Sequence, residues 1–534
     1  MVGLVALGVG CQLMSGLSDL GLGDQATGTA CTHSAQCQTE QCVDQVCCEV
    51  VCDSPCMGCN QPESEGICAP YAVRTDPDGD CPGMGLCDGS GSCAGGNHTW
   101  SLAFGDWNEQ GAYAVAVDDN RNIVVVGSFL GDVSFGGDLW HDAGQGDLFV
   151  AKFAPNGTPL WSRTYGDSAE QVGTGVAIGS NGEIVVAGRF HGTLNIPGYT
   201  LVAADGGSHF LVVLGENGTP QWSRSVPGQY SARVAVDPSS GDVVLAARLT
   251  DEAEFGSDTF TPVGPEDMYF ARYNEGNLLW ATHVVSQEEP LPPEEFVSVL
   301  GGLAVDSQGA TVFAGGFKTG LDFGDVVLEN QSVGSDAYVA KLDENGELVW
   351  ANRYGGGISQ FISGFALHDD DVVIVGTHVG PLQLGSTPLP SDLGRQDIFV
   401  GRLSAGGAHL MSRGFSGGGV VDERISYPTA VAVDAAQGNM VITGSLASPI
   451  NFGGEELRTA GLNDMFFAKL NPAGEHLYSK RYGDVHDQLA RAGAIDHQGD
   501  VVIAGQFQGT LDFGAPNPLQ AAGDFDIFLA KFTP

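Results

Sequence analysis

Three observations predict an all-β fold for residues 96–534. First, one unit of about 60 to 70 residues recurs seven times. One position in the last strand-like run of the unit holds a Trp, Met or Tyr in every copy. Second, each unit holds four short runs rich in Val, Ile, Phe and Ala, separated by glycine-containing turns. Third, no amphipathic helix of useful length follows residue 96. The residues at the position in the last run are Trp100, Trp161, Trp222, Trp280, Trp350, Met411 and Tyr478.

The first complete unit shows the pattern most clearly. Its four runs are 112–118, 123–129, 148–153 and 159–165. Asn-Gly pairs at 156–157, 217–218 and 345–346 suit the tight hairpin between the third and fourth runs. A four-stranded antiparallel unit repeated seven times predicts a seven-bladed β-propeller. A parallel β-helix is the alternative, but its turns are much shorter than about 60 residues.

Two recurring elements resemble the bacterial β-propeller repeats called SBBP repeats. A glycine-bounded run ending in Phe-Gly occurs at 127–136, 315–324 and 505–514, and a D-x-F-x-A-K strand or a close variant at 147–152, 336–341, 464–469 and 526–531. Copy two departs from the pattern with His209 in the Asp slot, and copy three has Ala246 and Ala247 before Arg248. The resemblance implies the propeller architecture and little about activity, because one fold hosts many functions.

The two ends of the repeat region complement each other. Residues 98–105 match the fourth strand of a unit, although no first three strands precede them, and the chain ends just after a third strand at 526–532. We therefore expect the 98–105 strand to be the outer strand of the last blade, which closes the ring.

The charge balance limits the classes of partner. The chain has 22 basic and 65 acidic residues, a formal net charge of −43. Such a field repels nucleic-acid phosphates and anionic membrane surfaces, so we expect no nucleic-acid partner. A role in solubility explains the acidity most simply, while calcium or a basic partner stays open.

The N-terminus has the features of a lipoprotein signal. Residues 1–11 form an apolar run that ends in small residues before Cys11, which we predict to carry a lipid. The run is short, lacks a preceding Lys or Arg, and has Leu7 one place too far from Cys11. An ordinary apolar N-terminus is the alternative. Residues 12–29, rich in Gly, Ser and Asp, suit a flexible tether.

Residues 30–95 are predicted to form a small disulfide-rich module. The chain has 13 cysteines, so setting Cys11 aside leaves an even number. So many cysteines in so short a segment are typical of a disulfide scaffold, because a module this small needs covalent bonds to hold its fold. Disulfide bonds in turn imply an oxidising compartment. Zinc is the rival, but only Cys56 and Cys59 have its spacing, and His33 is the one nearby histidine. The twelve predicted disulfide cysteines are Cys31, Cys37, Cys42, Cys47, Cys48, Cys52, Cys56, Cys59, Cys68, Cys81, Cys87 and Cys93.

The stretch 42–59 (CVDQVCCEVVCDSPCMGC) resembles cysteine-rich modules of exported myxobacterial proteins, which implies bacterial export. No run of 18 apolar residues occurs, so membrane attachment is expected through the lipid alone. Asp76, Asp78 and Asp80 could form a small calcium loop, but a turn explains them better. We expect no cofactor and no metal, with calcium left open.

No catalytic constellation is found at usable spacing. The propeller region lacks a G-x-S-x-G elbow, an H-E-x-x-H helix and a P-loop, and its histidines share no slot of the repeat. One acidic series does recur where the first strand of a unit ends. A ring of carboxylates could hold a cation at the channel mouth, but the trailing glycines favour Asx-turns. The series is Asp118, Asp237, Asp306, Asp434 and Asp496, with His368 and Asp369 in copy five and Gly179 interrupting copy two. The Asp of D-x-F is predicted to cap the loop before it.

Two classes of function remain. The first is a non-enzymatic exported protein, at the bacterial outer membrane or cell surface or secreted, whose monomeric propeller is an interaction scaffold. The second is an extracellular hydrolase or lyase at the propeller mouth. A protein or polysaccharide is expected to bind the face with the long second-to-third connections, with the insertions at 287–296 and 417–427 among its contacts. The ligand residues themselves are not identified by the sequence.

Overall fold

The computed structural model describes residues 25–52, 56–61, 64–71, 86–87, 93–287, 300–391, 396–417 and 426–534. The chain divides into two compact units, Gly96–Thr533 and Met1–Gly95, with Pro534 assigned to the latter. Residues 1–24, which hold Cys11, and residues 72–85, which hold the Asp76–Asp80 cluster, lie outside the described residues, as does most of each predicted insertion.

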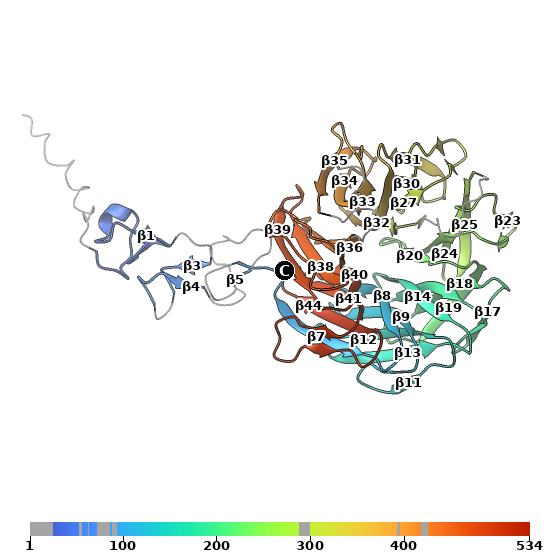
Figure 1. The fold of residues 1–534 in the computed structure, drawn as a ribbon, viewed down its shortest axis with the longest axis horizontal. Helices are drawn as coiled ribbons and strands as arrows, with labels where there is room; N and C mark the ends of the chain where they lie inside the picture. The colour runs from blue at the N-terminus through green and yellow to red at the C-terminus, as the bar shows by residue number, and fades with distance from the viewer. Residues whose placement is uncertain are drawn as a thin grey trace, which may run out of the picture. The chain divides into compact units, whose positions relative to one another are not determined.

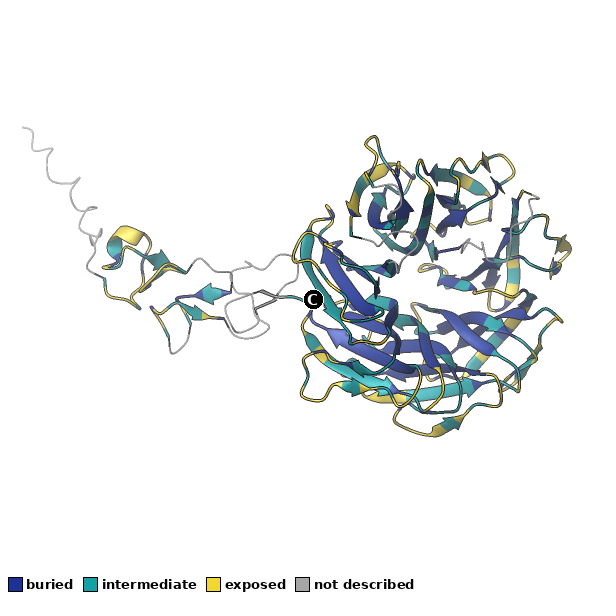
Figure 2. Ribbon diagram, viewed as in Figure 1, coloured by how far each residue is buried: buried dark blue, intermediate teal, exposed yellow. Residues whose placement is uncertain are grey.

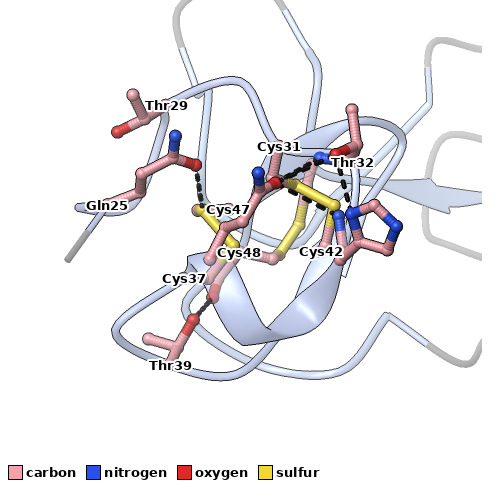
Figure 3. The surroundings of a disulfide bond; sticks show 12 residues. Gln25, Thr29, Cys31, Thr32, Cys37, Thr39, Cys42, Cys47 and Cys48 are labelled. Atoms are coloured by element: carbon pink, nitrogen blue, oxygen red, sulfur yellow. Dashed lines mark hydrogen bonds between the residues drawn. A yellow bond between two sulfur atoms is a disulfide. The ribbon is translucent and has the colours of Figure 1, made fainter. Parts of the chain in front are cut away.

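The N-terminal unit is built from short hairpins and disulfide bonds. Its elements are the 3-10 turn η1 (Ser34–Gln36) and the paired strands β1 (Cys42–Val43) with β2 (Val46–Cys47), β3 (Met57–Gly58) with β4 (Ala69–Pro70), and β5 (Leu86–Cys87) with β6 (Cys93–Ala94). Disulfides join Cys31 to Cys42 and Cys37 to Cys47 (Figure 3). Two more join Cys48 to Cys59 and Cys52 to Cys68. Cys56 is disulfide-bonded as well. A disulfide-rich module is therefore confirmed, and Cys59 of the alternative zinc pair is bonded to Cys48.

The second unit is a seven-bladed propeller, as the repeats predict. Each blade is a four-stranded antiparallel sheet, and the first strands lie at the centre of the ring (Figure 1). Blades one to three are β8 (Gln110–Val117), β9 (Ile123–Phe129), β12 (Asp147–Phe153), β13 (Pro159–Tyr165); β14 (Gln171–Ile178), β15 (Ile184–Phe190), β18 (Ser208–Leu214), β19 (Pro220–Pro227); and β20 (Arg233–Val236), β21 (Val243–Arg248), β24 (Met268–Asn274), β25 (Asn277–Ser286). Blades four to six are β26 (Gly302–Val305), β27 (Thr311–Phe317), β30 (Asp336–Leu342), β31 (Leu348–Tyr354); β32 (Ser359–His368), β33 (Asp371–Val379), β34 (Gln396–Leu403), β35 (His409–Phe415); and β36 (Tyr427–Val433), β37 (Met440–Leu446), β38 (Asp464–Leu470), β39 (His476–Tyr482).

Blade seven joins the two ends of the propeller. It is formed by β40 (Gln488–Ile495), β41 (Val501–Phe507), β44 (Asp526–Phe532) and β7 (His98–Phe104). β7 pairs with β44 from Phe104–Ile527 to His98–Phe532, so the first strand of the propeller is the outer strand of its last blade. The predicted ring closure is confirmed.

The long second-to-third connections are not open loops. Most contain a small hairpin, namely β10 (Asp132–Ser134) with β11 (Leu139–His141), β16 (Thr193–Ile196) with β17 (Tyr199–Val202), β22 (Ala253–Phe255) with β23 (Asp258–Phe260), β28 (Leu321–Asp322) with β29 (Val327–Leu328), and β42 (Thr510–Leu511) with β43 (Leu519–Gln520). The Phe of the recurring Phe-Gly element belongs to the core: Phe135 and Phe513 are 2% and 5% exposed. β28 also pairs with β25 of the preceding blade, which ties blade three to blade four.

The hydrophobic core lies between neighbouring blades. One cluster joins Val124 and Val150 of blade one to Val186 and Phe210 of blade two, and the other blade interfaces are filled in the same way. Second and third strands are buried on both faces, which explains their continuous apolar runs (Figure 2). The rigid part of the scaffold is therefore formed by the second and third strands at the interfaces between blades. The first and fourth strands are less buried and can carry residues that serve other functions.

A β-bulge in the first strand shapes the inner wall. In blade one, the register shifts between Ala112 and Ala114, so Tyr113 has no partner on β9. A Cβ on the facing Gly127 would lie only 1.9 Å from the carbonyl oxygen of Gly111. The recurring glycine of the second strand is thus required by the close approach of the bulged strand. The bulge turns one residue of each such blade toward the centre.

Candidate functional site

The centre of the propeller encloses a cavity of about 750 Å³. It is lined mainly by the first strands of the blades, whose walls carry small side chains. One ring position follows directly after the bulge and holds Ala114, Gly175, Gly302, Gly364, Ala430 and Ala492, with Arg233 in blade three. Arg233 therefore introduces a long cationic side chain into a ring of small residues.

The bulge position itself breaks the symmetry of the repeats. Register shifts place Tyr113, Thr174, Ser363, Thr429 and Arg491 at this position in blades one, two, five, six and seven, and all five line the cavity. The inward polar residues at this position therefore differ from blade to blade. The residue types at this one position range from a hydroxyl to a phenol and a guanidinium.

The hydroxyl residues at the bulge serve the fold. The Thr174 hydroxyl donates to the carbonyl of Ala232 at 2.9 Å, and the Ser363 hydroxyl donates to the carbonyl of Pro428 at 2.7 Å. Thr429 donates in the same way to Ala490, at 2.9 Å. In each case the bond reaches the next blade. Three of the bulge residues therefore join neighbouring blades, and Tyr113 and Arg491 are the exceptions.

Tyr113 and Arg491 belong to adjacent blades, since blade seven precedes blade one in the ring. Burial raises the pKa of the Tyr113 phenol, and the positive charges of Arg491 and Arg189 oppose this rise. Arg189 lines the cavity from the second strand of blade two, and its Nη2 lies 2.8 Å from Oε1 of Glu170. The Arg491 Nε is buried and has no hydrogen-bond partner among the described residues. One phenol thus lies in the electrostatic field of two guanidinium groups from its neighbouring blades.

Arg233 adds a third guanidinium to the cavity wall. Its Nη1 donates to the carbonyl of Thr174 at 3.2 Å, and burial lowers its pKa. Among the described residues, no carboxylate forms an ion pair with Arg233 or Arg491, and Glu170 is the one acidic residue that lines the cavity. The lining therefore carries an excess of positive charge in a strongly acidic protein. This arrangement can bind an anion.

The charged residues of the cavity lie toward the face with the long connections. Each first strand starts on that face, where the chain arrives from the preceding blade, and runs to the tight turn on the opposite face. Tyr113 and Arg491 occupy the fourth position of β8 and β40, and Arg189 occupies the next-to-last position of β15, which returns to the long-loop face. All three lie in the half of the strands nearest that face.

The recurring aspartates that end the first strands are engaged in turns and ion pairs. Asp118 Oδ1 accepts the N–H groups of Asn120 and Asn122, at 2.9 and 2.7 Å, and its Oδ2 lies 2.9 Å from Lys152 Nζ. Asp306 and Asp496 repeat both features with Lys341 and Lys531. The Asx-turn interpretation is confirmed.

The other members of this series follow the same plan. Asp237 accepts the N–H groups of Ser239 and Ser240 and pairs with Arg272, and its pKa is lowered to about 2 against the opposing effect of burial. Asp434 accepts the N–H of Gln437, and its charge opposes the burial that lowers the pKa of Lys469. In blade five, Asp371 takes the ion-pair role with Arg402, at 3.0 Å, while Asp369 forms part of the turn. Most of these carboxylates are therefore engaged by turns and ion pairs, while Oδ2 of Asp434 is buried without a hydrogen-bond partner among the described residues.

The Asp of the D-x-F element caps the long connection, as predicted. Asp147 accepts the N–H of Ala143 and Asp526 accepts the N–H of Ala522, at 3.3 and 2.9 Å. The assignment in copy two needs correction, because Ser208, and not His209, pairs with Phe190 as Asp147 pairs with Phe129. Ser208 also accepts the N–H of Ala204. The one-residue difference was invisible without the strand register.

A further recurring element, Gly-Asp-x-x-x-Gln at 105–110, 166–171 and 483–488, was missed by the sequence reasoning. Its aspartate orders the junction between two blades. Asp106 accepts the side-chain amide of Gln110, at 2.7 Å, and the N–H of Asp132, at 2.9 Å. Asp167 and Asp484 make the equivalent bonds with Thr193 and Thr510. Its regular spacing was the signal that could have revealed it.

Of the remaining sequence predictions, lipidation at Cys11 and calcium binding at Asp76, Asp78 and Asp80 concern residues outside the described part of the chain. Within the described residues, no helix is long and apolar enough to span a membrane.

Comparisons with known proteins find limited similarity. No protein-family model matches the chain. An uncharacterized WD repeat-containing protein, L264, of Acanthamoeba polyphaga mimivirus is 21% identical over 536 aligned positions, which cover 81% of this chain and 38% of the relative. The chain thus spans well under half of that relative's length. Among solved structures, the WD40 β-propeller domain of Doa1 aligns with a TM-score of 0.39 and 11% identity, over 82% of this chain and 97% of that one. Sqt1 from Chaetomium thermophilum aligns with a TM-score of 0.37 and 10% identity, over 83% and 100%.

Proposed function

We propose that this protein is a non-enzymatic interaction scaffold whose propeller binds a protein or polysaccharide on its long-loop face. The observation that carries this proposal is the asymmetry at the bulge position. Seven similar blades form a rigid scaffold, yet Tyr113 and Arg491 replace the residues that elsewhere join neighbouring blades. Side chains that depart from the repeat at the wall of a cavity, and that make no hydrogen bond to the next blade among the described residues, are suited to ligand binding.

Exposed apolar side chains on the same connections support this face. The five most exposed large apolar residues of the described chain all lie in the connections that begin or end there, and Trp107 is 82% exposed. On the opposite face, the recurring charged groups are held in buried ion pairs. The set consists of Trp107, Leu139, Val202, Val333 and Val485. The long-loop face therefore offers both apolar and cationic contacts to a partner.

The proposal places the protein outside the bacterial cytoplasm, as a monomer held at the outer membrane or cell surface by a lipid on Cys11, or secreted. The apolar run before Cys11 and the disulfides of the N-terminal unit support export, because such bonds persist in oxidising compartments. The net charge of −43 argues against a nucleic-acid partner.

The alternative, an extracellular hydrolase or lyase, needs an acid or base at the mouth of the propeller. Glycoside hydrolysis generally uses two carboxylates, but Glu170 is the one carboxylate among the described lining residues, and it pairs with Arg189. Burial raises the pKa of Tyr113, which makes its phenol a poor base near neutral pH. The described cavity therefore favours binding over catalysis.

The proposal is tested by screening the full chain, with Cys11→Ser to keep it off membranes, against glycan and protein arrays with and without calcium. A ligand found in this way is then titrated against a variant with the 287–296 and 417–427 insertions replaced by short Gly-Ser linkers, and against Trp107→Ala. Leu160→Ala, an exposed apolar change on the first residues of an outer strand, serves as the control. We expect the long-loop variants to weaken binding and the control to leave it unchanged. Equal affinity for all of them, with the fold intact, contradicts the proposed face.

A further inference from the structure

We propose that the central cavity binds a carboxylate group of a small ligand, through the Arg491, Arg233 and Arg189 side chains of its wall. This inference rests on the proposed function, since it names the ligand chemistry of the long-loop face. The cavity of about 750 Å³ has the size of a small-molecule site. It therefore admits a monomer, or the end of a chain, while the rim contacts anything larger.

The use of arginine in this chain makes the cluster unusual. The sequence has only 22 basic residues against 65 acidic ones, and most described arginines are held by carboxylates. Arg121, Arg272, Arg353, Arg402 and Arg481 all form ion pairs with aspartates. Arg233 and Arg491 have no such partner among the described residues, although acidic side chains are abundant. A guanidinium without a counter-ion in a partly buried wall is costly, because burial disfavours the charged form.

The donors and acceptors of the cluster are incompletely paired. The buried Nε of Arg491 has no hydrogen-bond partner among the described residues, and neither has Oε1 of Gln506, a residue that is 3% exposed. Gln506 Oε1 and the Tyr113 hydroxyl both lie beside Gly111, because a Cβ on that glycine would be 2.6 Å from each. A ligand carboxylate at this part of the wall can supply an acceptor for the Arg491 guanidinium.

The charge of the whole molecule favours carboxylate over phosphate or sulfate. A guanidinium can bind either kind of oxyanion with two parallel N–H bonds. Phosphate is close to a dianion at neutral pH, so the field of a protein with net charge −43 opposes its entry more strongly. A singly charged carboxylate obtains the same paired bonds at a lower electrostatic cost. Acidic sugars and acidic peptides both supply this group.

The test is calorimetric titration of the full chain, carrying Cys11→Ser, with four probes at low salt. Galacturonic acid represents an acidic sugar, and N-acetylglutamate represents an acidic peptide group. Galactose is the neutral control, and inorganic phosphate tests for general anion binding. We expect at least one carboxylate probe to bind, galactose to fail, and phosphate to bind more weakly. Which carboxylate binds more tightly identifies its source.

The variants Arg491→Gln and Arg233→Gln should each weaken carboxylate binding about tenfold or more, as loss of a charged hydrogen-bonded pair does. Arg458→Gln is the matched control, since Arg458 is exposed and pairs with Glu456 on the surface. Arg491→Lys keeps the charge but loses the paired geometry, so it should fall between wild type and Arg491→Gln. If Arg491→Gln does not fold by circular dichroism, Arg491→Lys and Arg233→Gln carry the test.

Three results overturn the carboxylate site: no carboxylate probe binds, phosphate binds as tightly as the carboxylates, or the cavity variants bind like the Arg458 control. Each leaves the proposed function standing if the array screen finds a partner that the rim variants weaken. Conversely, carboxylate binding without any rim-dependent partner supports the cavity site alone.

Discussion

The Nζ of Lys152 lies 2.9 Å from Oδ2 of Asp118, and the two side chains are 2% and 4% exposed. Blade two lacks both members of this pair, since Gly179 replaces the aspartate and Val213 occupies the lysine position. The joint loss has a physical reason. A single charge buried at this position destabilises the fold, because no opposite charge offsets its desolvation, whereas the absence of both charges destabilises it little.

The buried pair yields the first prediction. Lys152→Val leaves Asp118 without its cation and should lower the free energy of unfolding by about 3 kcal/mol or more. The double variant Asp118→Asn/Lys152→Val removes both charges while the amide oxygen still accepts the turn N–H groups. It should recover most of that loss in denaturant unfolding. A double variant that is less stable than the single one contradicts this account.

The second prediction concerns pH. Burial raises the pKa of Asp147 and of Asp526 to about 6, and nearby aspartates add to the rise. An unfolded aspartate titrates near 4, so between about pH 4 and 6 the folded state holds more protons than the unfolded chain. Stability contributed by these groups therefore falls as the pH rises through that window.

Replacement by asparagine removes this dependence. Asp147→Asn and Asp526→Asn should each stabilise the protein at pH 7 by on the order of 1 kcal/mol, and have little effect at pH 4. Thermal melts at both values measure this. Asp237→Asn is a control that should change stability in the opposite direction, because the pKa of Asp237 is lowered to about 2. Its carboxylate stabilises the fold above about pH 4, so its loss should destabilise the protein at pH 7. Equal shifts at pH 4 and pH 7 for Asp147→Asn would disprove the assignment.

Ring closure supplies the third prediction. Phe104 of β7 lies against Phe135 and Phe153 of blade one, with ring centroids 5.1 and 5.5 Å apart. Phe104→Ala should therefore cost about 3–5 kcal/mol, and deletion of residues 98–104 should lower the melting temperature sharply. Thr99→Ala on the same strand is the mild control. An unchanged melting temperature after the deletion would show that the closing strand is dispensable.

The fourth prediction concerns the N-terminal unit. In a bacterium that processes lipoproteins, with a working signal upstream, Cys11 should carry a diacylglyceryl group and the twelve cysteines from Cys31 to Cys93 should have no free thiol. Intact-protein and peptide mass spectrometry under non-reducing conditions measures both. Cys11→Ser should abolish membrane attachment and leave the disulfides in place. Several free thiols in the untreated protein would contradict an oxidised module.

The sequence predicts the propeller well because its evidence is local and repeated. Strand runs such as 123–129, the Asn-Gly turns and the match of the 98–105 strand to 526–532 are all visible without coordinates. The cavity residues were not predicted, because Tyr113 and Arg491 acquire their direction from a bulge that exists only in the pairing of two strands. For the same reason the sequence pattern assigned His209 to the Asp slot of copy two, whereas the strand register places Ser208 there.

The contact between Asn97 and Thr533 spans 436 residues. During synthesis, β7 emerges first among the propeller strands, yet its partner β44 emerges last. Until then the growing chain has an unpaired strand at each end, and such edges are templates for aggregation. Contacts of this sequence separation also make folding slow. Ring closure thus makes the final propeller stable at the cost of a long vulnerable interval, during which the nascent chain depends on its surroundings for protection.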